Sequence, residues 1–283
     1  MASLVTTADP STPSFAGTHH PLYFRQLLSG RDHCTNPDPS KPHQQMIFQY
    51  AKSMQNYQYL VGDAITKECV VIDPCWDVEG IVQASKFDGM NIVAGLATHY
   101  HFDHVGGRVP KWMKRRVFQG HSDTPSIVPG VKEIHDMGAP VYIHSLELKK
   151  LSDDTGVPRD ALRKMKQDQI IMVGKTHLRV IHTPGHSGGS VCLLVTRDGG
   201  QTPDLLISGD TIFPGSCGRT DLPESNSRHM MQSLMRLSTD ATLIDSLKVY
   251  GGHAYSGPFT TIGEERERGV LNPFAMKRML GVL

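Results

Sequence analysis

The stretch T-H-Y-H-F-D-H-V-G-G, residues 98–107, is the most informative part of the 283-residue chain. It places four side chains that can bind metals within six residues: His99, His101, Asp103 and His104. Imidazole and carboxylate groups suit zinc, iron and manganese. Residues two apart on an extended segment project to the same side, so His99 and His101 can reach one ion. Asp103 and His104 can face a second ion beside it, and the stretch predicts a metal-dependent enzyme.

Three further candidate ligands stand where predicted strands end. Apolar runs at 92–97, 178–181, 205–208 and 249–250 each lead to a His or Asp, often beside glycine. Loops at the strand ends of a rigid sheet bring residues that are distant in sequence into one site. These loops add His186 in T-P-G-H, Asp210 in S-G-D-T and His253 in G-G-H-A-Y.

The seven candidates divide naturally between two ions. A carboxylate can bridge two metals whereas an imidazole cannot, so Asp210 is the predicted bridge. One ion would take His99, His101 and His186, and the other Asp103, His104 and His253. We predict two divalent ions, zinc first with iron or manganese as alternatives, and Asp103 and Asp210 as catalytic carboxylates. Two ions roughly 3.5–4 Å apart would lower the pKa of a shared water and hold a hydroxide ready for attack.

The composition is that of an ordinary globular protein, with 39% hydrophobic and 20% charged residues. A net charge of +1 gives no indication of a nucleic-acid or membrane partner. The five cysteines are odd in number and lack C-x-x-C spacing, which fits a reducing compartment. We therefore expect a cytoplasmic protein. Residues 1–20 are predicted to be a flexible tail, although import into an organelle stays open.

Short β-like runs alternate with helical stretches from about residue 46, which predicts an α/β domain over 21–283. Expected strands cover 57–61, 69–72, 92–97, 141–143, 178–181, 190–195, 205–208 and 249–250. Expected helices cover 78–87, about 144–166 and 230–237. Residues 31–45 and 108–140 lack periodicity and are predicted loops. A loop as long as 108–140 tends to be a lid or an insertion.

The series H-x-H-x-D-H, T-P-G-H, G-D and G-H, in this order, resembles the ligand series of the metallo-β-lactamase-fold superfamily over about 57–272. The resemblance implies a four-layer αβ/βα sandwich with the site at one edge, between two sheets. Two later segments indicate one branch of this superfamily: C-G-R-T-D at 217–221, and the stretch from T-T-I-G-E-E-R to N-P-F at 260–274. They are similar to the branch that holds glyoxalase II (hydroxyacylglutathione hydrolase) and persulfide dioxygenase.

The two members of this branch imply different reactions. Glyoxalase II hydrolyses a glutathione thioester with two metals, and Tyr255 matches its glutathione-contacting position. That family has an additional helical domain where this chain has only residues 256–259. Persulfide dioxygenase uses one iron, here on His99, His186 and Asp210, and Asp221 matches its C-G-R-T-D.

We expect a thioester hydrolase acting on a glutathione-like small molecule such as S-acylglutathione, with a metal-bridging hydroxide as the nucleophile. A mononuclear iron dioxygenase acting on glutathione persulfide is the alternative. In the hydrolase, Arg219 would bind a substrate carboxylate in a forked pair, and Tyr255 would donate a hydrogen bond to the thiol carrier. The sequence carries no pattern that indicates an oligomeric state.

Overall fold

The computed structural model describes residues 21–41, 43–111, 127–197, 202–279 and 281. The predicted tail, residues 1–20, lies outside this part of the chain. The first of two main sheets has the order β1-β2-β3-β4-β7-β8. β1 to β3 are antiparallel, whereas β3, β4, β7 and β8 run parallel. The strands are β1 (Leu22–Leu28), β2 (Tyr57–Asp63), β3 (Glu68–Ile72), β4 (Asn91–Leu96), β7 (Val141–His144) and β8 (Leu162–Met165).

The second main sheet has the order β14-β13-β12-β11-β10-β9 and is antiparallel except for the β12–β13 pair. Its strands are β9 (Ile170–Val173), β10 (Thr176–His182), β11 (Val191–Thr196), β12 (Leu205–Gly209), β13 (Lys248–Gly251) and β14 (Thr260–Thr261). A small separate two-stranded sheet pairs β5 (Gly107–Arg108) with β6 (Ile127–Val128) in antiparallel orientation.

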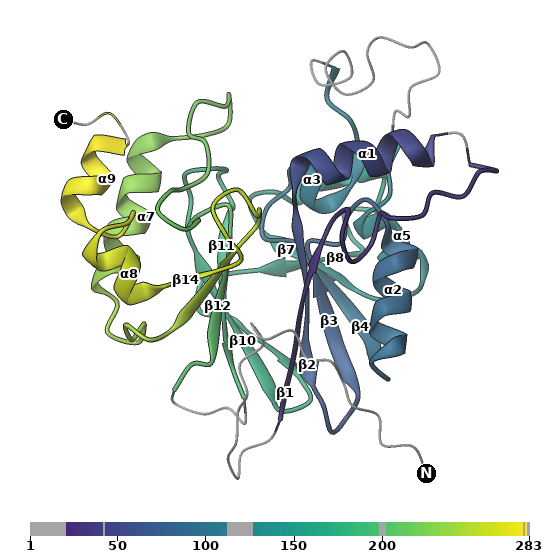
Figure 1. The fold of residues 1–283 in the computed structure, drawn as a ribbon, viewed down its shortest axis with the longest axis horizontal. Coiled ribbons are helices and arrows are strands. Elements are labelled where there is room, and N and C mark those ends of the chain that lie inside the picture. The colour runs from purple at the N-terminus through teal and green to yellow at the C-terminus, as the bar shows by residue number, and fades with distance from the viewer. Residues whose placement is uncertain (1–20, 42, 112–126, 198–201, 280, 282–283) are drawn as a thin grey trace.

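Helices cover the outer face of each sheet, so that the molecule has four layers (Figure 1). The helices on the side of the first sheet are α1 (Gln44–Met54), α2 (Val78–Phe87), α3 (Phe102–Val105), α5 (Val131–Asp136) and α6 (Leu148–Thr155). Those on the side of the second sheet are α7 (Ser227–Thr239), α8 (Ile262–Glu267) and α9 (Pro273–Met279).

The alternation of side chains along the strands produces this layering. In β11, Leu193 and Val195 belong to the apolar cluster between the two sheets. Cys192 and Leu194, one position along, belong to the cluster beneath α7 to α9. Successive side chains of a strand point to opposite faces, so a strand that is apolar throughout is buried on both faces. None of the described helices is long and apolar enough to cross a membrane.

The predicted strands all occur, with ends that shift by a residue or two, and the helix at 78–87 agrees with α2. The helix predicted through about residue 166 is wrong in its second half. α6 ends at Gly156, which adopts a left-handed conformation with φ of 77°, and the chain then forms β8. Because Arg163 and Lys164 are both exposed in the middle of this short edge strand, the sequence shows no strand alternation there.

The segment 108–140 is also more regular than predicted. Part of it, residues 112–126, lies outside the described residues. The rest contains β6 and α5, and α5 buries Val131 and Ile134. A helix of six residues is too short to show a clear 3.6-residue period. The sequence reasoning also did not identify β1, α1, β9, β14, α8 and α9.

Candidate metal centre

The motif at 98–107 lies directly after β4, at the edge where the two sheets meet. His99 and His101 lie in the extended connection, and the single-turn helix α3 carries Asp103 and His104. Gly106 ends this helix with φ of 72°, and a Cβ atom there would lie 2.6 Å from the carbonyl oxygen of Pro129. A glycine is therefore needed for both the backbone conformation and the close approach.

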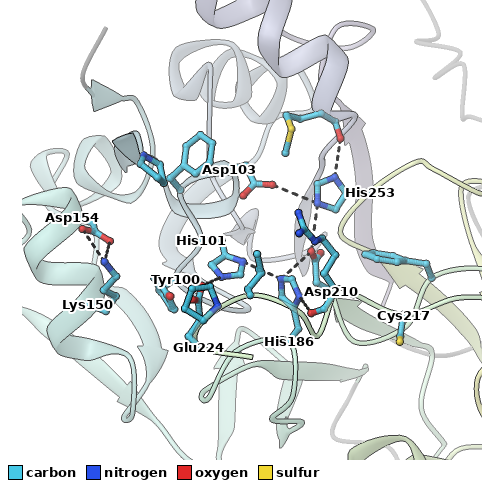
Figure 2. Close-up of a pocket in the computed structure, with 18 of the residues that line it drawn as sticks. Tyr100, His101, Asp103, Lys150, Asp154, His186, Asp210, Cys217, Glu224 and His253 are labelled. Carbon is cyan, nitrogen blue, oxygen red and sulfur yellow. Dashed lines mark hydrogen bonds and ion pairs between the residues drawn. The ribbon is translucent and has the colours of Figure 1, made fainter. Parts of the chain in front are cut away.

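The second sheet contributes the other three candidates from the loops that follow its strands. His186 follows β10, Asp210 comes directly after β12, and His253 follows β13. The structure thus brings all seven candidate ligands into one site, and Figure 2 shows several of them pointing toward one another. Six are buried and His101 is half-buried.

The ring nitrogens form two groups. In the first, His101 Nδ1 lies 3.0 Å from His99 Nε2 and 2.9 Å from His186 Nε2. In the second, His104 Nε2 lies 3.3 Å from His253 Nε2, which is 3.5 Å from Asp103 Oδ2. The ligand atoms of each group lie within 4.8 Å of one another. These are the two sets into which the sequence divided the residues.

Asp210 lies between the two groups. Its Oδ2 is 3.3 Å from His186 Nε2, and its Oδ1 is 3.4 Å from His104 Nε2. Oδ1 is buried and has no hydrogen-bond partner among the described residues. A buried carboxylate oxygen that accepts no hydrogen bond, beside converging imidazole nitrogens, is costly unless a cation binds there. The donor set therefore fits two divalent metal ions with Asp210 between them.

The protonation states of His99 and Asp210 agree with this assignment. Burial, together with neighbouring imidazoles, lowers the pKa of His99 well below its ordinary value, so that the ring is neutral. Burial alone would raise the pKa of Asp210, but His253, His104 and His186 hold it well below its ordinary value. Neutral imidazole and ionised carboxylate are the forms that bind metals.

His104 behaves differently from His99. Burial lowers its pKa, but Asp210, Asp103 and Asp73 outweigh this effect and raise the pKa to about 10. Three buried carboxylates therefore favour a positive charge at this place, and a metal cation would supply that charge.

A second layer of residues holds the rings, and sequence reasoning did not identify it. Asp73 Oδ2 lies 2.9 Å from His104 Nδ1, and Glu224 Oε1 lies 2.8 Å from His101 Nε2. The remaining partners are backbone carbonyls or a hydroxyl: Met54 O for His253, Arg219 O for His186, and Thr98 Oγ1 for His99. Such contacts orient metal-binding histidines. Asp73 did carry a signal, because it follows a strand as the candidate ligands do.

A cleft of about 650 Å³ opens over the centre. Both predicted substrate contacts line it. Tyr255 is 55% exposed and stacks on the ring of His253, with the ring centroids 4.5 Å apart. Arg219 is exposed, and its guanidinium pairs with Asp221 at 2.8 and 2.9 Å. Arg219 is therefore within the cleft lining, but in this structure it binds a carboxylate of the protein itself.

Comparison with known proteins agrees with the fold and the site. The sequence profile of the metallo-beta-lactamase superfamily matches residues 53–253. A Bacillus subtilis (strain 168) protein described as the probable metallo-hydrolase YqgX is 32% identical over 232 residues, which are 77% of this chain and 91% of that protein. The chain therefore belongs to the metallo-beta-lactamase superfamily, and the predicted four-layer fold is confirmed.

Two other similarities concern metals. A Bacillus velezensis protein described as the probable polyketide biosynthesis zinc-dependent hydrolase BaeB is 27% identical over 206 residues, 73% of this chain and 76% of its own. The crystal structure of TTHA1623 in a di-iron-bound form is 27% identical with a TM-score of 0.54, and the match covers 76% of this chain and 94% of that one.

Proposed function

We propose that this protein is a metal-dependent hydrolase that cleaves a thioester such as an S-acylglutathione. The observation that carries the proposal is the pair of ligand groups that meet at Asp210. His99, His101 and His186 would hold one ion, Asp103, His104 and His253 the other, and Asp210 would contact both. When bound, two such ions polarise a carbonyl group and lower the pKa of water.

The relatives support the hydrolytic class and leave the metal open. Those described as a metallo-hydrolase and a zinc-dependent hydrolase are consistent with hydrolysis, whereas the structure of TTHA1623 is of a di-iron-bound form. We propose zinc as the resident metal, because zinc suits the imidazole and carboxylate donors of both groups.

The chain itself would bind and orient the substrate. The cleft is wide enough for a small molecule, and its rim combines apolar rings with charged groups. We propose that Arg219 exchanges Asp221 for a substrate carboxylate and that the hydroxyl of Tyr255 donates a hydrogen bond to the thiol carrier. A thiolate is a good leaving group, so the reaction needs no strong acid at this site.

Metal content and substrate turnover of the purified protein test the proposal together. We expect two metal ions in the centre, hydrolysis of S-acylglutathione with release of one thiol per turnover, and loss of activity in Asp210→Asn. Absence of thioester hydrolysis by the metal-loaded protein would refute the proposal. A single iron with oxygen uptake on glutathione persulfide would support the dioxygenase, in which His99, His186 and Asp210 hold the metal.

A further inference from the structure

The segment that follows β1 and the residue that caps the start of α2 together form a separate cluster of metal-competent side chains. It consists of His33, Cys34 and Asp77. His33 Nδ1 lies 3.2 Å from Cys34 Sγ, and the backbone N–H of Cys34 donates to Asp77 Oδ2 at 3.0 Å. One ligand atom from each residue lies within 4.8 Å of the other two. None of these residues belongs to the catalytic centre.

The histidine of this cluster is buried and held in a fixed orientation. His33 is 2% exposed. The fully buried Gln58 accepts a hydrogen bond from His33 Nε2 through its Oε1. Nδ1 therefore carries a lone pair, and this lone pair faces Cys34 Sγ. An amide oxygen behind the ring is the kind of outer contact that orients metal-binding histidines.

We propose that His33, Cys34 and Asp77 bind a third divalent metal ion of the zinc type. Imidazole nitrogen, thiolate sulfur and carboxylate oxygen are all donors that zinc takes. The ion would displace the thiol proton of Cys34, and the thiolate and the Asp77 carboxylate would together balance its charge. Asp77 also borders a cavity of about 340 Å³, through which a water molecule can complete the coordination.

The position of the cluster indicates a structural role. Cys34 packs in one apolar cluster with Ile47 and Phe48 of α1 and with Trp76, next to Asp77. α1 in turn supplies Tyr50 and Met54 to the wall of the catalytic cleft. An ion on His33, Cys34 and Asp77 would therefore fasten the segment before α1 to the start of α2 and stabilise this wall.

X-ray absorption at the zinc edge of the wild-type holoprotein tests the proposal directly. The seven residues of the catalytic centre offer only nitrogen and oxygen donors. We therefore expect a zinc–sulfur distance of about 2.3 Å, which requires a cysteine ligand. In cobalt-substituted protein, the same ligation gives a thiolate-to-cobalt charge-transfer band in the near ultraviolet. Spectra that contain no sulfur contribution would overturn the proposal, with no variant needed.

Two variants locate the thiolate. Cys34→Ser is expected to lose the charge-transfer band and one equivalent of metal, whereas Cys217→Ser keeps both. Cys217 is the matched control because it is the half-buried cysteine that lines the catalytic cleft. A band that survives in Cys34→Ser, or that disappears in Cys217→Ser, would show that Cys34 is not the ligand. Asp210→Asn should abolish hydrolysis but keep the band, so failure of the third site and failure of the proposed function give different results.

Discussion

At the scale of single residues, the centre depends on contacts that fix which nitrogen of each ring faces inward. His104 and His253 turn their Nε2 atoms toward Asp103 and Asp210, because their Nδ1 atoms are held elsewhere. His101 faces inward with Nδ1, since its Nε2 is held by Glu224. The sequence motif gives the identity of these rings, whereas the outer partners give their orientation.

Asp73→Asn tests this second layer. Asp73 accepts hydrogen bonds from the backbone N–H and the hydroxyl of Thr98, and it also lies beside the ring of His104. The asparagine side chain keeps the shape of the aspartate but removes the negative charge beside the ring. We expect metal affinity to fall by about 10- to 100-fold, measured by competition with a chelating dye. Glu133→Gln is a suitable control, because Glu133 accepts a hydrogen bond from the backbone N–H of Gly130 at the start of α5 and not from a candidate ligand. Unchanged affinity in Asp73→Asn would mean that Asp73 has no orienting role.

Replacement of Arg219 tests whether this side chain binds the substrate carboxylate. Arg219→Ala should raise KM for S-acylglutathione by about fivefold, roughly 1 kcal/mol, because the side chain is solvent-exposed. The value of kcat should change little. The matched variant Asp221→Asn releases Arg219 from its intramolecular partner and should lower KM or leave it unchanged. If KM is the same in Arg219→Ala as in the wild type, Arg219 does not bind the substrate.

At the scale of elements, loops at strand ends carry the site, and neighbouring helices hold these loops. Glu147, directly before α6, is 3% exposed and belongs to the first half of the fold. Its Oε1 accepts a hydrogen bond from the hydroxyl of Ser187 and another, 2.8 Å long, from the backbone N–H of Gly189. Both donors lie in the loop that carries His186. Glu147 is therefore a positioning residue for that ring.

Replacement of Glu147 should affect the first ligand group selectively. In Glu147→Gln we expect the affinity for one of the two catalytic ions to fall by about tenfold while the other stays bound. The thermal midpoint should drop by a few degrees in this variant and in the capping control Glu133→Gln. Metal titrations that are identical in Glu147→Gln and in the control would contradict the positioning role.

A pair of histidines also links elements of the two sheets. His144 of β7 stacks on His182 of β10, with the ring centroids 4.0 Å apart. Burial and, to a smaller extent, His182 lower the pKa of His144 to about 4. The unfolded chain binds a proton at His144 near pH 6.5, whereas the folded chain binds it only near pH 4. Protonation between these two pH values therefore favours the unfolded state. The stability of the fold that the neutral ring permits above pH 6.5 is lost as the pH falls toward 4.

Urea unfolding of the wild type and of His144→Gln at several pH values measures this effect. The difference in free energy of unfolding between them should shrink by on the order of 2 kcal/mol between pH 6.5 and 4. The contribution of the metal ligands is common to both proteins and cancels in this difference. Parallel pH curves would show that His144 titrates normally in the folded state.

At the scale of the whole molecule, the centre joins the two halves of the sandwich. Four of its residues follow β4 of the first sheet, and three follow strands of the second. Metal ions held there would bind the folded chain more tightly than the unfolded chain, because only folding brings the four residues after β4 together with the three from the second sheet. Binding that is specific to the folded state stabilises it by about 2.7 kcal/mol at a concentration 100-fold above the dissociation constant.

Removal of the metals should therefore destabilise the whole fold. We expect a chelator to lower the thermal midpoint by several degrees, in proportion to that free energy, and added zinc to restore it. Asp210→Asn should show a smaller response, because its centre binds metal weakly from the start. A midpoint that is insensitive to chelator in the wild type would mean that the centre holds no tightly bound metal.

The sequence by itself predicted eight of the strands and the seven candidate ligands, and the resemblance carried by its motifs predicted the superfamily. These follow from local signals, since apolar runs, glycines and ligand-type residues at strand ends can be read along the chain. It also gave the division of the ligands into two groups, although their role as metal ligands stays a prediction. The second half of the helix predicted through about residue 166 was wrong, because β8 is a four-residue edge strand with two exposed basic residues and carries no local pattern.

Only the tertiary structure decided what surrounds those ligands. Asp73, Glu147 and Glu224 come from three different elements or loops. Asp73 follows a strand as the candidate ligands do, but nothing in the neighbours of Glu147 and Glu224 along the chain distinguishes them from surface carboxylates. The cleft, the pairing of Arg219 with Asp221 and the cluster at His33, Cys34 and Asp77 likewise appear only after folding. The physical reason is that orientation, burial and charge compensation depend on residues far apart in the chain, which local sequence patterns do not record.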